Sequence, residues 1–204
     1  MDAELLWNLG EVIFPDLLTL RNTDKESLIC NFFPRWILME SSIDYGINND
    51  YYSNLIRTGE LDGWIINFYG SSDTNRLPDD EILKIFKPYW KYFYDEVAHP
   101  IIEKKFDKVE CVALFLLILF DDAYTNISEE SARLIQSLRK VILRELKGYQ
   151  MDNENSEMRF LNVISTLILL EKGEQKFQEE VLICGLNNIS LHDDFKTMMQ
   201  VNKM

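Results

Sequence analysis

The segment from Phe14 to Glu40 constrains the fold of this chain more than any other. Pro15 interrupts a first helical pattern, and a second pattern starts near Asp24 and continues to about Asp44. Few positions of this second pattern could face water, because most of it is apolar. Its apolar side chains are Leu28, Ile29, Phe32, Phe33, Trp36, Ile37 and Met39. A helix that is apolar on nearly all sides lies inside a domain. The sequence therefore predicts a central, buried helix in an α-helical protein.

Length and composition fit one globular domain without membrane spans. A chain of 204 residues buries about 70% of its unfolded surface, and an apolar content of 47% suits a packed core. The net charge of −13 argues against a nucleic-acid surface, which needs clustered Lys and Arg. No signal peptide is visible, and the longest apolar run, Cys111 to Phe120, is shorter than the roughly 18 residues that cross a bilayer. We therefore expect a soluble, intracellular protein.

The spacing of apolar residues predicts mostly helices. They are expected over residues 1–21, 24–44, 107–120, 128–149, 157–185 and 191–201. The apolar run in 107–120 also fits a buried strand, but no alternation of strands and helices exists elsewhere, which favours a helix. A segment from Leu77 is interrupted by Pro88 and Pro100 and is either two helices or one kinked helix.

Residues 51 to 70 have a different character. Aromatic and β-branched residues alternate with Gly59, Gly63 and Gly70, which predicts two short strands over 54–57 and 64–69. The expected fold class is therefore all-α with a small two-stranded β-hairpin.

No pattern for catalysis or metal binding is present. Cys30, Cys111 and Cys184 lie far apart among apolar residues, which is typical of reduced core thiols. His99 and His192 have no partner nucleophile in any known spacing. We expect no enzymatic activity, no cofactor and no metal.

The chain carries the motif Phe14-Pro15-Asp16-Leu17-Leu18-Thr19-Leu20, followed by Asp24-Lys25 and then Trp36. This motif resembles the signature of the ligand-binding domain of nuclear hormone receptors, in particular its divergent nematode branch. Glu110 before its apolar run, Ser128-Glu129 and Arg159-Phe160 resemble the starts of the eighth, ninth and tenth helices. The likeness covers nearly all of residues 1–204 and implies a single domain with a three-layer helical sandwich. It also implies regulation of transcription in the nucleus.

The chain departs from this family pattern in three ways. Its three cysteines cannot form the two four-cysteine zinc sites of the family's DNA-binding module, so no direct nucleic-acid contact is expected. The resemblance implies that the chain begins within the third helix and that the early helices are missing. The family's charge clamp for a coactivator helix needs a Lys and a Glu, where this chain has Val12 and Thr197.

The resemblance also assigns candidate site residues. The walls of a lipophilic pocket would come from Leu6, Leu9, Ile37, Leu38, Ser41, Trp64, Phe68, Val181 and Cys184. A coregulator groove, without its charge clamp, would involve Val12, Lys25, Ile29, Phe195, Met198 and Met199. A dimer face would comprise Phe160, Val163, Ile164 and Leu167, although the same residues could be internal to the domain. Glu110 and Arg159 would form a structural ion pair. Abundant aromatic residues favour a small or collapsed pocket over a large one.

Three functions follow from these observations. The first is a transcription-regulating domain that senses a lipophilic small molecule or acts constitutively. The second is a ligand-free module that dimerises with complete receptors and modulates them. The third is an unrelated helical scaffold.

Overall fold

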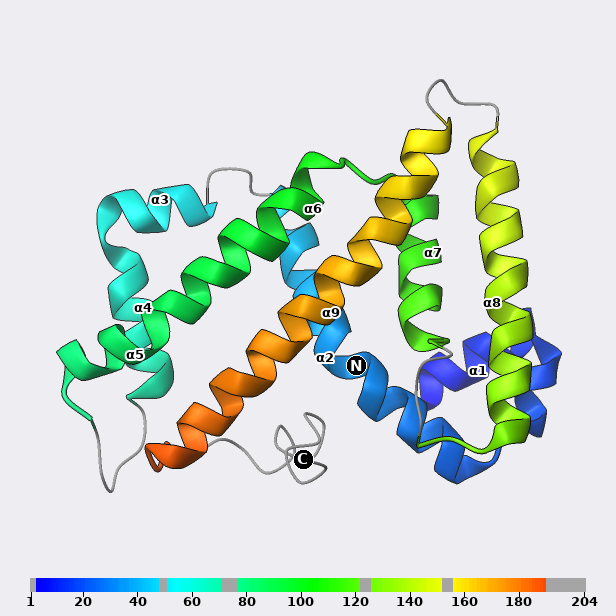
Figure 1. Ribbon diagram of the computed structural model, residues 1–204, viewed down its shortest axis with the longest axis horizontal. Helices are drawn as coiled ribbons and strands as arrows, with labels where there is room; N and C mark the ends of the chain where they lie inside the picture. Colours follow the sequence, from blue (N-terminus) through cyan, green and yellow to red (C-terminus); the bar gives the residue numbers. More distant parts are fainter. Residues whose placement is uncertain (1–2, 48–50, 71–76, 122–125, 152–155, 190–204) are drawn as a thin grey trace. The chain divides into compact units, whose positions relative to one another are not determined.

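The computed structural model describes residues 3–47, 51–70, 77–121, 126–151 and 156–189, and all regular structure within them is helical (Figure 1). In chain order the elements are α1 (Ala3–Ile13), the 3-10 helix η1 (Pro15–Thr19), α2 (Asn22–Ile47), α3 (Tyr51–Thr58), α4 (Glu60–Tyr69), α5 (Asp79–Tyr92), the π-helix η2 (Phe93–Ala98), α6 (His99–Glu103), α7 (Lys108–Leu119), α8 (Glu129–Gln150) and α9 (Ser156–Leu186). The expected all-α class is confirmed. The helix expected over 191–201 lies outside the described residues.

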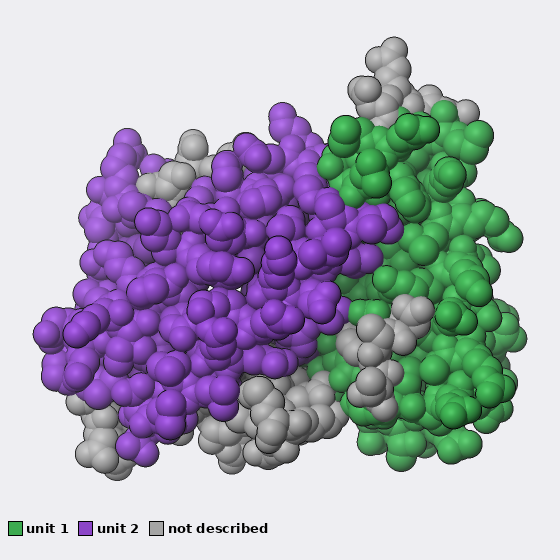
Figure 2. All heavy atoms as spheres, in the orientation of Figure 1, with its two compact units in different colours: residues 1–33, 107–163 green, residues 34–106, 164–204 purple. Residues whose placement is uncertain are grey.

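The chain forms two compact units (Figure 2). Unit 1 comprises residues 1–33 and 107–163, and unit 2 comprises residues 34–106 and 164–204. Helices α2 and α9 each supply residues to both units, because the chain passes from one unit to the other at Pro34 and at Ile164.

The break expected at Pro15 is confirmed. Helix α1 ends at Ile13, and Pro15 opens η1. Proline lacks a backbone N–H, but at the first position of a helix this N–H would have no hydrogen-bond partner within the helix. Leu17 of η1 is fully buried, and the Phe14 ring meets the Phe120 ring edge-on with centroids 6.1 Å apart. The local turn therefore anchors the start of the chain in unit 1.

Helix α2 has the buried character that its composition predicts. Leu28 and Phe32 in unit 1 and Met39 in unit 2 have no exposed surface. The helix is continuous through Pro34. It therefore contributes core residues to each unit in turn.

Helices α7 and α8 begin at side-chain caps. Asp107 accepts a hydrogen bond from the Glu110 backbone N–H at 2.9 Å, and the Glu110 carboxylate accepts from the Asp107 N–H at 3.0 Å, which forms a capping box. Ser128 caps α8 in the same position. The apolar run to Phe120 is helical, as expected, and the two helices pack together in unit 1.

The β-hairpin prediction is wrong. Residues 51–58 form α3 and residues 60–69 form α4, joined at Gly59, whose φ of +75° lies in the left-handed region that favours glycine. Leu61, Ile65 and Tyr69 are buried at four-residue spacing, so one face of α4 packs inward. Burial of this helical face outweighs the β preference of the aromatic and β-branched residues.

The proline-interrupted segment is one helical stretch with a change of geometry. Pro88 lies inside α5, Pro100 lies at the start of α6, and the π-helix η2 separates them. Helices α4 and α5 pack together in unit 2, with Ile65, Ile82 and Phe86 fully buried between them and their neighbours. This packing positions the aromatic residues at the end of α5, Tyr89, Trp90 and Tyr92.

Candidate functional site

Unit 2 contains a cavity of about 320 Å³, which we call the aromatic cavity. This volume lies at the lower end of the roughly 300–1,000 Å³ typical of small-molecule sites. Its walls come from α2, α4, α5, η2 and α9: Ile37, Leu38, Ser41, Phe68, Tyr69, Tyr89, Trp90, Tyr92, Phe93, Val97, Gly173, Lys176, Phe177 and Glu180. Such a lining, mainly apolar and aromatic with a few polar groups, can hold a small lipophilic molecule.

Gly173 allows three elements to approach closely at one wall of the cavity. A Cβ atom at this position would lie 3.0 Å from Leu38 Cδ1 on α2 and 3.1 Å from Val97 Cγ2 on η2. The absence of a side chain therefore lets α9 pack directly against both neighbours.

The π-helix η2 forms another wall. Phe93 and Val97 both line the cavity, and Tyr92 precedes the π segment directly. A π-helix has a wider turn than an α-helix, and such segments frequently occur at functional sites. The altered turn sets where the Phe93 and Val97 side chains lie relative to those of α5.

A chain of hydrogen bonds crosses the cavity wall. The Trp90 indole N–H donates to the Tyr69 hydroxyl at 3.0 Å, and that hydroxyl donates to the Glu180 carboxyl. The Tyr69 ring is stacked on Phe86 with centroids 3.8 Å apart, which fixes its position. The Glu180 side chain is only partly buried as a whole, but its carboxyl is desolvated, and this raises the pKa of Glu180 to about 8.

Lys176 carries the second charged group of the lining, and its charge is already paired. Its ammonium contacts the Glu179 carboxylate and lies 5.1 Å from the centre of the Tyr89 ring. The hydrogen bond to Glu179 raises the pKa of Lys176. Lys176 therefore stays protonated at neutral pH.

The structure brings four of the predicted pocket residues together at the aromatic cavity: Ile37, Leu38, Ser41 and Phe68. Trp64 is 54% exposed and is not part of the lining. Val181 and Cys184 are buried on α9 but do not line the cavity either. Leu6 and Leu9 belong to α1 in unit 1, and the Leu9 side chain lies outside the described residues.

Sequence reasoning missed most of the polar and aromatic lining from α5, η2 and the middle of α9. Tyr89, Trp90, Tyr92 and Phe93 formed a visible aromatic cluster in the sequence, but only the π geometry shows which of them share a wall. In the sequence, Glu180 is one of several acidic residues on a long helix. The desolvation of its carboxyl could have been inferred only from the apolar residues one turn away.

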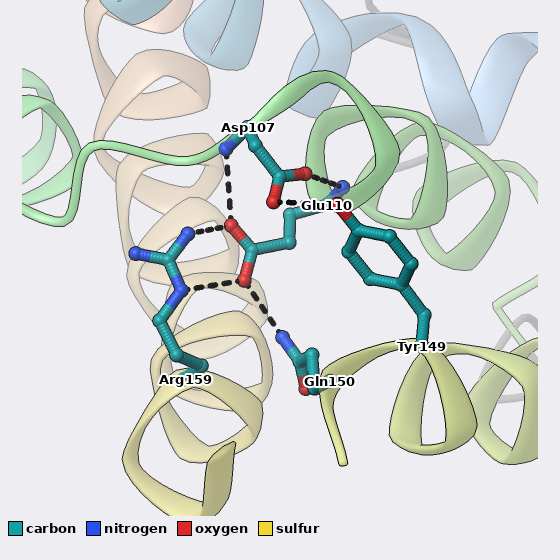
Figure 3. A network of polar contacts seen from close by, with 5 residues as sticks. All are labelled: Asp107, Glu110, Tyr149, Gln150 and Arg159. Atoms are coloured by element: carbon teal, nitrogen blue, oxygen red, sulfur yellow. Dashed lines mark hydrogen bonds and ion pairs between the residues drawn. The ribbon is translucent and has the colours of Figure 1, made fainter. Parts of the chain in front are cut away.

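In unit 1, Glu110 and Arg159 are in direct contact (Figure 3). Arg159 Nε donates to Glu110 Oε1 at 2.8 Å, and a second guanidinium nitrogen donates to the other carboxylate oxygen. Gln150 Nε2 also donates to Glu110 Oε1, at 2.7 Å, and Glu110 has no exposed surface. The carboxylate thus accepts bonds from α8, α9 and the backbone N–H of Asp107. These contacts fit a structural role.

The predicted coregulator residues are only partly described. Val12 is 80% exposed, Ile29 is buried, and Phe195, Met198 and Met199 lie outside the described residues. The Lys25 ammonium contacts the Glu11 carboxylate at 2.6 Å and lies 5.7 Å from the centre of the Trp7 ring. Its charge is therefore neutralised within unit 1.

The predicted dimer residues are all at least partly buried. Val163 is fully buried, and Phe160, Ile164 and Leu167 are partly buried. Met158 and Leu161, on the same helix in unit 1, are 60% and 57% exposed. The exposed face of this part of α9 is therefore offset from the predicted one.

Other sites are not apparent in the part of the chain that the structure describes. No group of three His, Cys, Asp or Glu side chains could hold a metal ion there. His99 is exposed and lies 3.6 Å from Glu103, and His192 is outside the described residues. None of the described helices combines the length and apolar character needed to cross a bilayer.

Unit 2 thus combines helices with a largely apolar cavity that can hold a small lipophilic molecule. Comparison with known proteins is more specific: residues 13–187 match the family described as the ligand-binding domain of nuclear hormone receptor. The chain belongs to this family. Members of the family are receptors rather than enzymes, which supports the expectation of a non-enzymatic role.

The similar curated proteins are nematode receptors. Nuclear hormone receptor family member nhr-150 of Caenorhabditis elegans is 35% identical over 100% of this chain and 60% of its own length. Family member nhr-16 of the same species is 26% identical over 97% of this chain and 53% of its own length. The chain thus spans little more than half the length of these relatives. The resemblance to the divergent nematode branch is confirmed.

Proposed function

We propose that this chain is the ligand-sensing part of a nuclear transcription regulator, with residues 1–204 forming one ligand-binding domain. Its family membership supports a role in transcription generally. The aromatic cavity supports the proposal of ligand sensing, because it offers about 320 Å³ of largely apolar space with a few fixed polar groups. A lipophilic molecule would fill this space and contact the aromatic walls around it.

Native mass spectrometry of the chain expressed in cells tests this proposal. We expect a co-purified molecule of low mass that is lost from Ser41→Phe, because the new ring would occupy the cavity. Ser137→Phe adds the same ring on the exposed surface of α8 and should retain the molecule. Identical spectra for both variants would contradict ligand binding in the aromatic cavity.

A second candidate function is dimerisation with another receptor. The exposed Met158 and Leu161 side chains on α9 favour it, because large apolar residues on one helix face are costly to leave in water. Dimerisation does not require a ligand. Through it, the chain would modulate complete receptors.

Coregulator binding remains a proposal, but it would depend on apolar contacts instead of a charge clamp. Position Val12 has no charge to hold the end of a bound helix, and Lys25 is paired with Glu11. A partner helix would therefore have to bind through apolar contacts, for which Val12, Ile13 and Leu18 are exposed by 64% or more. A peptide of the Leu-x-x-Leu-Leu type that binds wild type and is lost with Val12→Glu would support this groove.

A further inference from the structure

The most informative feature of the aromatic cavity is the Glu180 carboxyl in its wall. The Tyr69 hydroxyl donates to it, and among the described residues no cation contacts it. A carboxylate removed from water is costly unless it is paired. The cavity wall therefore holds an acidic group that would ionise on meeting a cation, and none of the described residues supplies that cation.

The nearest cation of the lining does not fill this role. The Lys176 ammonium is paired with Glu179 and lies over the Tyr89 ring. Within the described residues, the other titratable groups of the lining are the phenols of Tyr69, Tyr89 and Tyr92, and the thiol of Cys184 lies one turn from Glu180 on α9. None of these groups carries positive charge.

The remaining walls suit a cation as well. Aromatic rings are presented by α4, α5, η2 and α9, and their faces attract positive charge. The contact of Lys176 with Tyr89 shows that a ring of this lining already holds an ammonium group. The formal net charge of −13 would also draw cations toward the molecule.

We propose that the aromatic cavity binds a small lipophilic amine, with its ammonium group against Glu180 and its apolar body between the aromatic walls. This inference rests on the proposed ligand-sensing function and assigns its ligand class. At roughly 30 Å³ for each water-sized group, the space of 320 Å³ holds on the order of ten non-hydrogen atoms. An aralkylamine has this size. A fatty acid would place a second carboxylate beside Glu180.

Binding should release a proton. Desolvation raises the pKa of Glu180 to about 8, so the empty site carries a protonated carboxyl at pH 7. Alkylammonium ions remain protonated there, since amines of this kind titrate near pH 10. When the ammonium enters, the carboxyl ionises and its proton passes to the buffer. The affinity should therefore rise as the pH is raised from about 6.5 to 8.5.

Isothermal titration calorimetry with three matched probes tests the assignment. Phenethylamine, 2-phenylethanol and 3-phenylpropionate share the aromatic body and differ in charge. We expect phenethylamine to bind wild type about tenfold more tightly than the alcohol, the difference expected from one ion pair and one cation–π contact. In Glu180→Gln this preference should vanish while the alcohol binds as before. Glu171→Gln removes the same charge from an exposed site on α9 and should keep the preference.

Two results would overturn the assignment in different ways. If the alcohol or the acid binds wild type as tightly as the amine, the ligand class is wrong but the cavity remains a ligand site. If none of the three binds, both the amine assignment and ligand sensing at this cavity are contradicted. Proton release is measured on wild type alone, by comparing heats in buffers of different ionisation enthalpy. It therefore remains decisive if Glu180→Gln fails to fold, and its absence at pH 7 would also overturn the assignment.

Discussion

The Arg159 guanidinium forms a two-pronged contact with the fully buried Glu110 carboxylate, with Nε 2.8 Å from Oε1. The contact joins the start of α9 to the capping box of α7 within unit 1. Because Glu110 also serves as a helix cap, one carboxylate determines both where α7 begins and where α9 packs.

Removal of the arginine should destabilise the protein strongly. Arg159→Met leaves Glu110 buried without its charge partner, and we expect the free energy of unfolding to fall by about 3 kcal/mol. Urea unfolding followed by circular dichroism measures the change. Glu157→Gln, at an exposed position on the first turn of α9, should have less than about 0.5 kcal/mol of effect. Equal stability of Arg159→Met and wild type would rule out a structural role for the pair.

Asp24 should stabilise the junction of α2 and α8 in a pH-dependent way. Its carboxylate accepts from the hydroxyls of Ser128 and Ser131, each at 2.6 Å. Burial alone would raise the pKa of Asp24, but these hydrogen bonds and the nearby Arg21 charge outweigh it, so the pKa is lowered. A lowered pKa contributes stability above the unfolded value near 3.8, and this stability is lost as the pH falls.

Asp24→Asn should therefore cost about 1–2 kcal/mol at pH 7, and the cost should shrink below about pH 4. Asp16→Asn on the exposed surface of η1 serves as the control and should behave like wild type. Chemical unfolding between pH 3 and pH 7 provides the measurement. A cost that is independent of pH would show that shape rather than charge matters at this position.

Glu180 should have the opposite pH dependence. Its pKa is raised from 4.5 to about 8 by desolvation, so the folded state holds a proton that the unfolded state loses between these values. Stability is then lost as the pH rises from about 4.5 to about 8, by at most about 1.4 kcal/mol per pH unit. Glu180→Gln keeps an acceptor for Tyr69 and should flatten this slope. Parallel pH profiles for variant and wild type would show that the carboxyl titrates normally.

Two aromatic residues of α4 provide a matched test of the cavity's position. Phe68 lines the aromatic cavity, whereas Trp64, one turn earlier, does not. We expect Phe68→Ala to weaken binding of a cavity ligand about tenfold through lost apolar and aromatic contact. Trp64→Ala should change the affinity by less than about twofold. The reverse order of effects would place the ligand one turn earlier along the same face of α4.

The exposed face of α9 makes a further prediction for association. If Met158 and Leu161 form a dimer contact, Leu161→Arg should shift a dimer toward monomer in size-exclusion chromatography with light scattering. Leu186→Arg, also on α9 and 78% exposed, serves as the control. A monomer for wild type at high concentration would remove the proposal of self-association.

Much of the helical framework could be predicted from the sequence because its signals are local. Ser128 as the cap of α8 and Glu110 at the start of α7 were readable from residue type and spacing. Residues 51–69 were misread because β-branched and aromatic residues suit strands in isolation. Only the burial of Leu61, Ile65 and Tyr69 on one face decides for a helix.

The site was less predictable than the fold. Ile37, Leu38 and Ser41 could be placed from their position on the central helix. Gly173 and Glu180 could not, because their roles depend on how closely α9 approaches other helices and on the desolvation that results. Tertiary contacts of this kind leave no periodic signal in a single sequence.

The most direct test of the central claim is a crystal structure of the chain purified from cells and soaked with phenethylamine. We predict density in the aromatic cavity, with the amine nitrogen within hydrogen-bond distance of the Glu180 carboxylate and the phenyl ring between Phe68 and Phe177. A cavity closed by its own aromatic side chains, with no density beside Glu180, would contradict it.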